Sequence, residues 1–125
     1  MATTLTKAFV DLIASNFQNL SVALIRQDGT ECSGGGYIRI SFGQVQTSED
    51  TDYIYISNAT QLAFALASAD IAPLNNLVSK VRLYNGSNIV ATIDLTQAKP
   101  YLNQDQFIIA INGLKIKIPK VNTWV

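Results

Sequence analysis

The sequence predicts a mainly β protein: an antiparallel β-sandwich or flattened barrel that follows a short N-terminal α-helix. Three observations lead to this fold class. Short apolar segments alternate with a period of two after residue 20, Asp-Gly and Asn-Gly dipeptides separate several of them, and only the N-terminal residues show a helical spacing. A chain of 125 residues can also bury a hydrophobic core without disulfides or metal ions. We therefore expect one domain over residues 1–125, with a helix at 3–16, a β-sandwich at 20–118 and a C-terminal tail at 119–125.

The N-terminal helix is indicated by an apolar face. Leu5, Phe9, Leu12 and Ile13 follow the i, i+4, i+7, i+8 spacing of one side of a helix. We expect this face to pack against the sheet of its own domain. Because Lys7 is the only basic residue between 3 and 16, a helix that lies on a membrane surface is disfavoured.

The strands are expected where the alternation is regular. Their expected ranges are 20–26, 37–42, 53–56, 61–67, 81–84, 89–95, 106–111 and 114–118. The alanines of 61–67 favour a helix, but the alternation of Leu62, Phe64 and Leu66 favours a strand, which we prefer. Residues 48–52 and 71–78 are expected to be loops.

Tight turns are expected between several of these strands. Asp28-Gly29 closes the first strand, and Asn85-Gly86-Ser87-Asn88 joins 81–84 to 89–95 as a hairpin. Asn112-Gly113 is expected to join 106–111 to 114–118 as a second hairpin, because Asn-Gly is the strongest short hairpin signal.

The composition argues against catalysis. The chain has no histidine and one cysteine, Cys32. The commonest general base and metal ligand is therefore missing, and a cysteine zinc cluster is excluded. We expect Cys32 to be a small buried apolar residue, because a nucleophilic thiol needs a base beside it. We expect no enzyme activity, no catalytic residue, no cofactor and no metal site.

The charge balance argues against nucleic acid as a partner. Lys+Arg and Asp+Glu both number nine, so the net charge is zero, whereas phosphate binding needs a net basic patch. The residues that could form a stacking face for bases are Tyr37, Arg39, Tyr53, Tyr55, Arg82 and Tyr84. No apolar run reaches the roughly 18 residues of a membrane span, so we expect no membrane partner either.

The most distinctive segment is Ser33-Gly34-Gly35-Gly36-Tyr37-Ile38-Arg39. Three glycines before a strand suggest a bend, a bulge or a phosphate-binding loop. A phosphate loop requires a helix after the glycines and, in one class, a lysine beside them, and neither feature is present. We interpret the run as a backbone bend that leads into the strand at 37–42.

The acidic loop Glu49, Asp50 and Asp52 could offer oxygen ligands to calcium. It lacks the glycine and the terminal glutamate of an EF-hand, so we prefer a solvated turn. No pair among the nine acids stands out as a glycosidase pair.

The tail after Pro119 carries the only tryptophan, Trp124. Trp124 either folds back over its own domain or forms, with Val121 and Val125, an arm that contacts a neighbouring subunit, because tryptophan is a favoured interface anchor.

The segment Thr30-Glu31-Cys32-Ser33-Gly34-Gly35-Gly36-Tyr37-Ile38-Arg39 resembles a Glu-Val-Ser-Gly-Gly-Gly-Tyr-Ala-Arg signature. That signature belongs to small structural proteins of tailed bacteriophages that are often labelled tail-fibre-like. The similarity extends more loosely to Val81–Gly86 and to the closing strands, over roughly residues 20–118. The resemblance implies a small β domain that is a repeated, non-catalytic component of the virion.

We have three functional expectations, and the first two build on the resemblance. The first is a capsid decoration or cement protein that is made in the host cytoplasm, binds the major capsid protein or tail proteins, and forms a homo-oligomer. An alternative is a protein of the tail, baseplate or fibre. A further alternative, from another class, is a small glycan-binding or glycan-hydrolysing protein.

Overall fold

The structure is a computed structural model, and it describes residues 1–123. Within these residues the chain forms one α-helix, one 3-10 helix and eleven strands. In chain order they are β1 (Ala2–Thr4), α1 (Lys7–Ala14), η1 (Ser15–Asn19), β2 (Ser21–Arg26), β3 (Ile40–Ser41), β4 (Val45–Glu49), β5 (Tyr53–Asn58), β6 (Leu62–Leu66), β7 (Val78–Asn85), β8 (Asn88–Lys99), β9 (Gln106–Ile109), β10 (Lys115–Pro119) and β11 (Val121–Thr123). All strand pairs are antiparallel, so the expected mainly β, sandwich-like fold class with a short N-terminal helix is confirmed.

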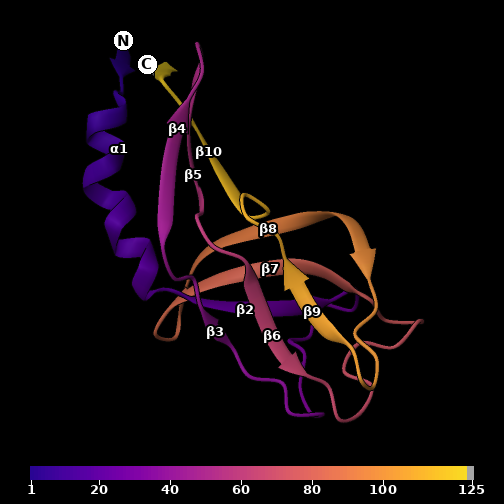
Figure 1. Ribbon diagram of the computed structural model, residues 1–125. Helices are drawn as coiled ribbons and strands as arrows, with labels where there is room; N and C mark the ends of the chain where they lie inside the picture. Colours follow the sequence, from indigo (N-terminus) through magenta and orange to yellow (C-terminus); the bar gives the residue numbers. More distant parts are fainter. Residues whose placement is uncertain (124–125) are drawn as a thin grey trace.

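The strands form two parts. The body combines a four-stranded sheet of order β3-β2-β7-β8 with the pair β6-β9. The second part, which we call the lobe, combines the sheet β10-β5-β4, the helix α1 and the pair β1-β11. Figure 1 shows the lobe projecting from the body, with the N-terminus and the last described strand, β11, near its tip.

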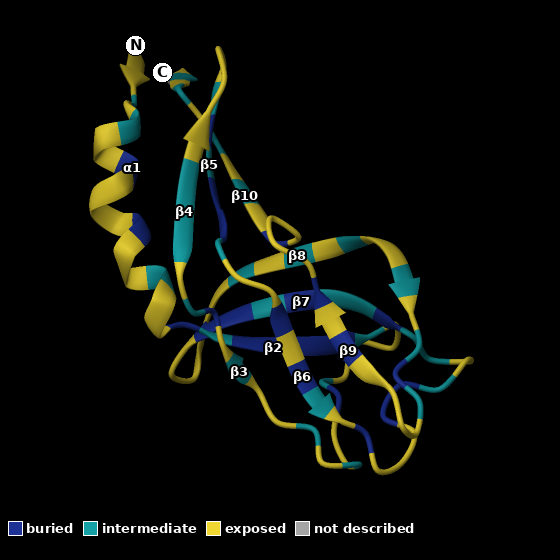
Figure 2. Cartoon of the chain, in the orientation of Figure 1, coloured by how far each residue is buried: buried dark blue, intermediate teal, exposed yellow. Residues whose placement is uncertain are grey.

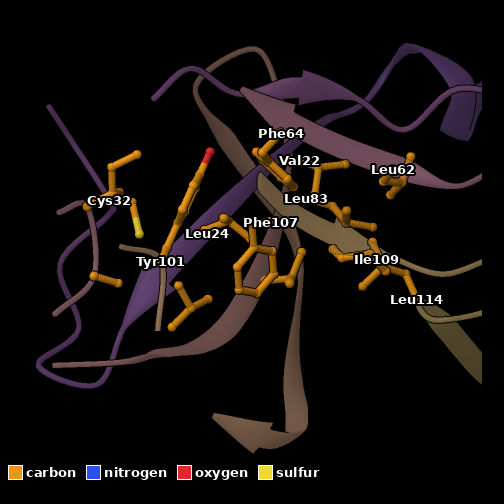
Figure 3. Packing of buried hydrophobic residues seen from close by; sticks show 14 of the residues in the cluster. Val22, Leu24, Cys32, Leu62, Phe64, Leu83, Tyr101, Phe107, Ile109 and Leu114 are labelled. Atoms are coloured by element: carbon orange, nitrogen blue, oxygen red, sulfur yellow. The ribbon is translucent and has the colours of Figure 1, made fainter. Parts of the chain in front are cut away.

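The main core lies between the two sheets of the body. Figure 3 shows side chains of β6 and β9 meeting those of β2 and β7; they include Leu62, Phe64, Phe107, Ile109, Val22, Leu24 and Leu83. Phe64 packs edge-to-face on Phe107, with ring centres 6.2 Å apart. The expected strand at 61–67 is confirmed, because Leu62 and Phe64 are buried here while Ala63 between them is exposed.

A smaller core lies under the helix. Val10 and Ala14 of α1 pack against Ile54 and Ile56 of β5. The expected packing face was wrong except for Leu5, which packs against this core: Phe9, Leu12 and Ile13 are exposed, and Figure 2 shows α1 mostly exposed. Valine and alanine, one turn apart, let the helix approach the sheet closely, so the face with the larger side chains is turned outward.

The N-terminal helix is also shorter than the expected 3–16. Residues 2–4 form β1 instead of the first turn, and the α-helix ends at Ala14 before the 3-10 turn η1. The segment Ala2–Thr4 is extended because it pairs with Val121–Thr123 at the opposite end of the chain.

The prediction of a hairpin at Asn112-Gly113 was wrong, because the strands on either side of this turn do not pair with each other. The turn itself is present, with Asn112 at a positive φ of 65° and the Gly113 N–H donating to the Ala110 carbonyl at 2.8 Å. However, β9 pairs with β6 and β10 pairs with β5. The buried Asn58 holds this crossing, because its side chain donates to the Ala110 carbonyl and accepts from the Leu114 N–H.

The strand expected at 37–42 is reduced to Ile40–Ser41. The ladder stops because the edge of β2 is already occupied at Leu24. The Tyr37 hydroxyl accepts a hydrogen bond from the Leu24 N–H at 3.0 Å, and the Leu24 carbonyl accepts one from the Cys32 N–H at 2.9 Å. The hairpin at 85–88 is confirmed, with longer strands than expected.

The strand β4 was not expected, because Val45-Gln46-Thr47-Ser48-Glu49 shows no apolar alternation. It forms by pairing with β5 beneath α1. Of the loop expected at 48–52, residues 50–52 form the turn of this β4–β5 hairpin, whereas Ser48 and Glu49 belong to β4.

The expected C-terminal tail at 119–125 belongs to the lobe through residues 119–123. Val121–Thr123 pairs with β1, the Lys120 N–H donates to the Asp52 carbonyl at 2.9 Å, and the Leu5 N–H donates to the Lys120 carbonyl at 2.6 Å. Trp124 and Val125 lie outside the described residues.

Candidate functional site

The glycine segment Ser33–Arg39 lies between β2 and β3. Gly34, Gly35 and Gly36 all have positive φ, at 77°, 56° and 83°. The bend is closed by the Tyr37 N–H, which donates to the Gly34 carbonyl at 2.9 Å. Glycine adopts positive φ without steric cost, so the run is a backbone bend.

Glu31 is the centre of a polar cluster beside this bend. Arg39 binds its carboxylate with two hydrogen bonds, from Nε to Oε2 at 2.9 Å and from Nη2 to Oε1 at 2.8 Å. Tyr37 donates its hydroxyl to Oε2 at 2.9 Å. The hydrogen bonds from Arg39, followed by that from Tyr37, hold the pKa of Glu31 below its usual range.

Tyr37 links this cluster to the core. Its ring lies parallel to Phe64, with ring centres 6.2 Å apart and planes at 8°. Its hydroxyl stands between the Leu24 N–H and the Glu31 carboxylate, and burial raises the pKa of the phenol. The tyrosine therefore ties the bend to β2 and remains protonated at neutral pH.

The cluster continues onto the outer face of β7. The guanidinium of Arg39 lies 3.9 Å from the ring centre of Tyr84, a cation–π contact. The neighbouring Arg82 has a buried Nε without a hydrogen-bond partner.

The arrangement of these side chains suits a structural role. Glu31, Tyr37 and Arg39 satisfy one another and the backbone of β2. Cys32 is buried beside them, at 2% exposure, as expected, and burial raises the pKa of its thiol to about 11. Such a thiol is protonated at neutral pH and is a poor nucleophile. The cluster holds the bend in place and offers no activated group.

The other candidate residues are dispersed. Tyr53 and Tyr55 lie in the lobe, beneath the ammonium groups of Lys117 and Lys115, whereas Tyr37 is directed into the body. The residues considered as a stacking face for bases therefore do not lie on one face; they are Tyr37, Arg39, Tyr53, Tyr55, Arg82 and Tyr84.

Asp50 acts within the β4–β5 turn. Its carboxylate accepts hydrogen bonds from the N–H groups of Asp52 and Tyr53 and from the hydroxyl of Tyr55, and the Tyr55 bond is the main cause of its lowered pKa. Within residues 1–123, no group of three or more His, Cys, Asp or Glu residues could hold a metal ion. No helix in the same range has the length and hydropathy needed to cross a membrane.

The outward side of α1 is an apolar surface. We call Phe9, Leu12 and Ile13 the α1 surface; they are 48%, 75% and 42% exposed. The spacing i, i+3, i+4 places them side by side on one face of the helix. The sequence revealed their spacing but not their exposure.

A groove of about 200 Å³ lies between the end of β8 and β9. Its apolar lining includes Leu95, Phe107 and Ile109, and its charged lining includes Asp94 and Lys99. The groove marks where β8 and β9 are not joined by a strand ladder. Sequence reasoning missed it, because it depends on which strands remain unpaired.

The remaining predicted site residues are placed as follows. Ser33 is exposed at the start of the bend, and Val121 is 57% exposed on β11 at the tip of the lobe. The structure therefore brings together Tyr37 and Arg39 but leaves Val121 in the other part of the molecule. A subunit contact by Trp124 and Val125 stays a prediction.

Comparisons of the chain with protein-family models, with curated proteins and with solved structures found no match.

Proposed function

We propose that this chain is a non-catalytic structural protein of a tailed bacteriophage particle, and that it binds both copies of itself and other particle proteins. The more specific proposal is a decoration or cement protein of the capsid. The motif at 30–39, which resembles the phage signature, supports the assignment to a phage particle. The exposed α1 surface supports the binding role.

The observation that carries the proposal is the α1 surface. Leu12 is 75% exposed, and it is flanked by Phe9 and Ile13, which are also exposed. Adjacent exposed apolar side chains are typical of surfaces that another protein covers. Figure 2 shows α1 on the outside of the projecting lobe.

The glycine segment supports a non-catalytic role. Its polar side chains bind one another, and its glycines provide a bend. A small β domain of this kind suits a repeated component of a particle, for which a rigid shape and contact surfaces are the requirement.

The proposal is tested first by cryo-electron microscopy of the phage particle whose genome encodes the chain. Density for the domain on the shell supports the decoration role. Density on the tail, baseplate or fibre refutes that role and favours the alternative position. Absence of the chain from purified particles refutes the particle role altogether.

The contact itself is tested with Leu12→Lys. Lysine has a helix propensity close to that of leucine, so the free energy of unfolding should change by less than about 0.5 kcal/mol at this exposed site. Binding to particles should weaken by about fivefold or more, because a central apolar contact contributes more than about 1 kcal/mol. The matched control is Leu74→Lys, in a loop of the body, where Leu74 is 74% exposed. Equal binding by the two variants would show that the α1 surface is not the contact.

A further inference from the structure

The strand β8 is an unpaired edge of the body sheet. The sheet order β3-β2-β7-β8 leaves one side of β8 without a hydrogen-bonded partner, and β9 lies across a groove from its end at Asp94–Lys99. Among the described residues, the backbone of Asn88–Lys99 forms hydrogen bonds with no element except β7. A free edge presents a row of N–H and C=O groups to which another strand can add.

The edges at β10, β3 and β4 are protected, and β8 is not. The edge strand β10 carries exposed Lys115 and Lys117, β3 has only two residues, and β4 is covered by α1. By contrast, Asp94 is the only charged residue between positions 88 and 98, and no proline interrupts this stretch. Lysine and proline are the usual means of blocking strand addition, so β8 retains the properties of a pairing edge.

The part of β8 suited to pairing is short and well defined. The register with β7 shifts at Leu83/Tyr84, where β8 has an extra residue, and again between Val78 and Lys80, beyond Asp94. Between these irregularities Ala91–Asp94 pair regularly with β7, and the alternating burial continues through Leu95, the first residue beyond that ladder. We call Ala91–Leu95 the β8 window. Ala91, Ile93 and Leu95 pack toward the core, whereas Thr92 and Asp94 are exposed on the outer face.

The β8 window is complementary to a second copy of itself. When two windows run antiparallel about Ile93, Ala91 faces Leu95 of the second copy and the two Ile93 side chains meet. On the outer face the Thr92 hydroxyl can donate to Asp94 of the second copy, and this pair occurs twice. Asp94 binds Lys80 through Oδ1 at 2.8 Å, which leaves Oδ2 to accept that bond.

Shifted registers are less favourable. Pairing about Asp94 places two carboxylates directly opposite each other, which is destabilising. Pairing about Thr92 brings in Val90, the extra residue at the first irregularity, and places this exposed apolar side chain opposite Asp94 of the second copy. The charge pattern and the irregularities therefore select the register centred on Ile93.

We propose that two copies of this chain pair antiparallel through their β8 windows, with a twofold axis at Ile93. The result is one continuous eight-stranded sheet across an isologous interface. The inference rests on the proposed function only in expecting that copies of the chain associate.

The electrostatic test is Thr92→Asp, with Thr92→Asn as the matched control. Aspartate at 92 faces Asp94 of the second copy, so like charges oppose each other twice. Within one chain, position 92 pairs with Arg82 of β7, so the new carboxylate has a cation nearby and the subunit stays folded, as a thermal melt would verify. The dimer dissociation constant, measured by analytical ultracentrifugation, should rise about 2- to 30-fold relative to Thr92→Asn.

The register is tested by oxidative cross-linking. In the proposed dimer Ile93→Cys places two thiols directly opposite each other, within reach of a disulfide. Ala91→Cys places its two thiols about 13 Å apart along the strands, which a disulfide cannot span. The double variant Ala91→Cys/Leu95→Cys should cross-link again. Cys32 is buried and present in every variant, so it contributes the same background to each.

The outcomes separate the two proposals. Rapid cross-linking of Ile93→Cys without that of Ala91→Cys supports the twofold pairing. A monomer at all concentrations, equal cross-linking of the two single variants, or equal dissociation constants for Thr92→Asp and Thr92→Asn would overturn it. None of these results depends on the particle, and absence of the chain from particles would overturn the proposed function without affecting the dimer.

Discussion

Replacing Gly35 with alanine should destabilise this protein more than the same change at Gly34. Both glycines have positive φ, at 56° and 77°. A Cβ at position 34 would meet no atom within 4 Å, whereas a Cβ at 35 would lie 2.8 Å from Ile71 Cγ1 and 3.0 Å from the Ala69 carbonyl oxygen. The two variants share the conformational cost and differ in the steric cost.

The magnitudes follow from these contacts. An alanine in the left-handed region destabilises the fold by about 1–2 kcal/mol. Replacing glycine also lowers the entropy of the unfolded chain, which stabilises the fold by about 0.4–1 kcal/mol. Gly34→Ala should therefore lower the free energy of unfolding by roughly 1 kcal/mol. Gly35→Ala adds overpacking against a buried side chain and the backbone, about 1–3 kcal/mol more. The Ala69 carbonyl cannot move freely, because the Ser68 N–H beside it donates to the Gly35 carbonyl at 3.0 Å.

The assay is urea denaturation followed by circular dichroism, with both variants and the unchanged chain at one pH. The expected order of stability is unchanged chain, then Gly34→Ala, then Gly35→Ala, with a gap of at least about 1 kcal/mol between the variants. Equal stabilities would show that the bend relaxes away from the loop at 68–71, and would refute the close-packing argument.

Two further predictions concern the cluster beside this bend. Glu31→Gln should lower stability at neutral pH, and its deficit relative to the unchanged chain should shrink as the pH falls below about 4. The reason is that a carboxylate with a lowered pKa stabilises the fold above its unfolded pKa and loses this effect as it is protonated. Denaturation curves between about pH 3 and 7 measure the stability deficit of the variant. A deficit that stays constant over this range would contradict the prediction. Cys32 should react with a thiol reagent at pH 8 at least about 100-fold more slowly in the folded chain than in urea, because burial raises its pKa from 9.0 to about 11. Equal labelling rates would contradict this.

The local chemistry of short segments was sufficient for several predictions. Leu62 and Phe64 alternate with smaller residues, and the strand and its buried face follow directly. The Asn85-Gly86 turn adopts the hairpin that its dipeptide favours, and the glycines at 34–36 form the bend that they indicate. Each of these features depends on residues adjacent in the chain.

Features that depend on distant partners were not predictable in this way. The Asn112-Gly113 turn is present, yet its flanking strands pair with β6 and β5, because the buried Asn58 holds the crossing between two sheets. The α1 surface is exposed because Val10 and Ala14 fit the lobe more closely than the larger residues do. Helical spacing shows that two faces exist but not which one is covered.

By itself, the sequence determined the β class, the short N-terminal helix, the buried thiol and the bend in this protein, because propensity, periodicity and positive φ are properties of neighbouring residues. Only the tertiary structure decided that Val121–Thr123 pairs with the N-terminus, that β8 has a free edge, and that the apolar side of α1 faces outward. Pairing and exposure are set by contacts between residues far apart in the chain, where many arrangements satisfy the same local pattern and packing selects one of them.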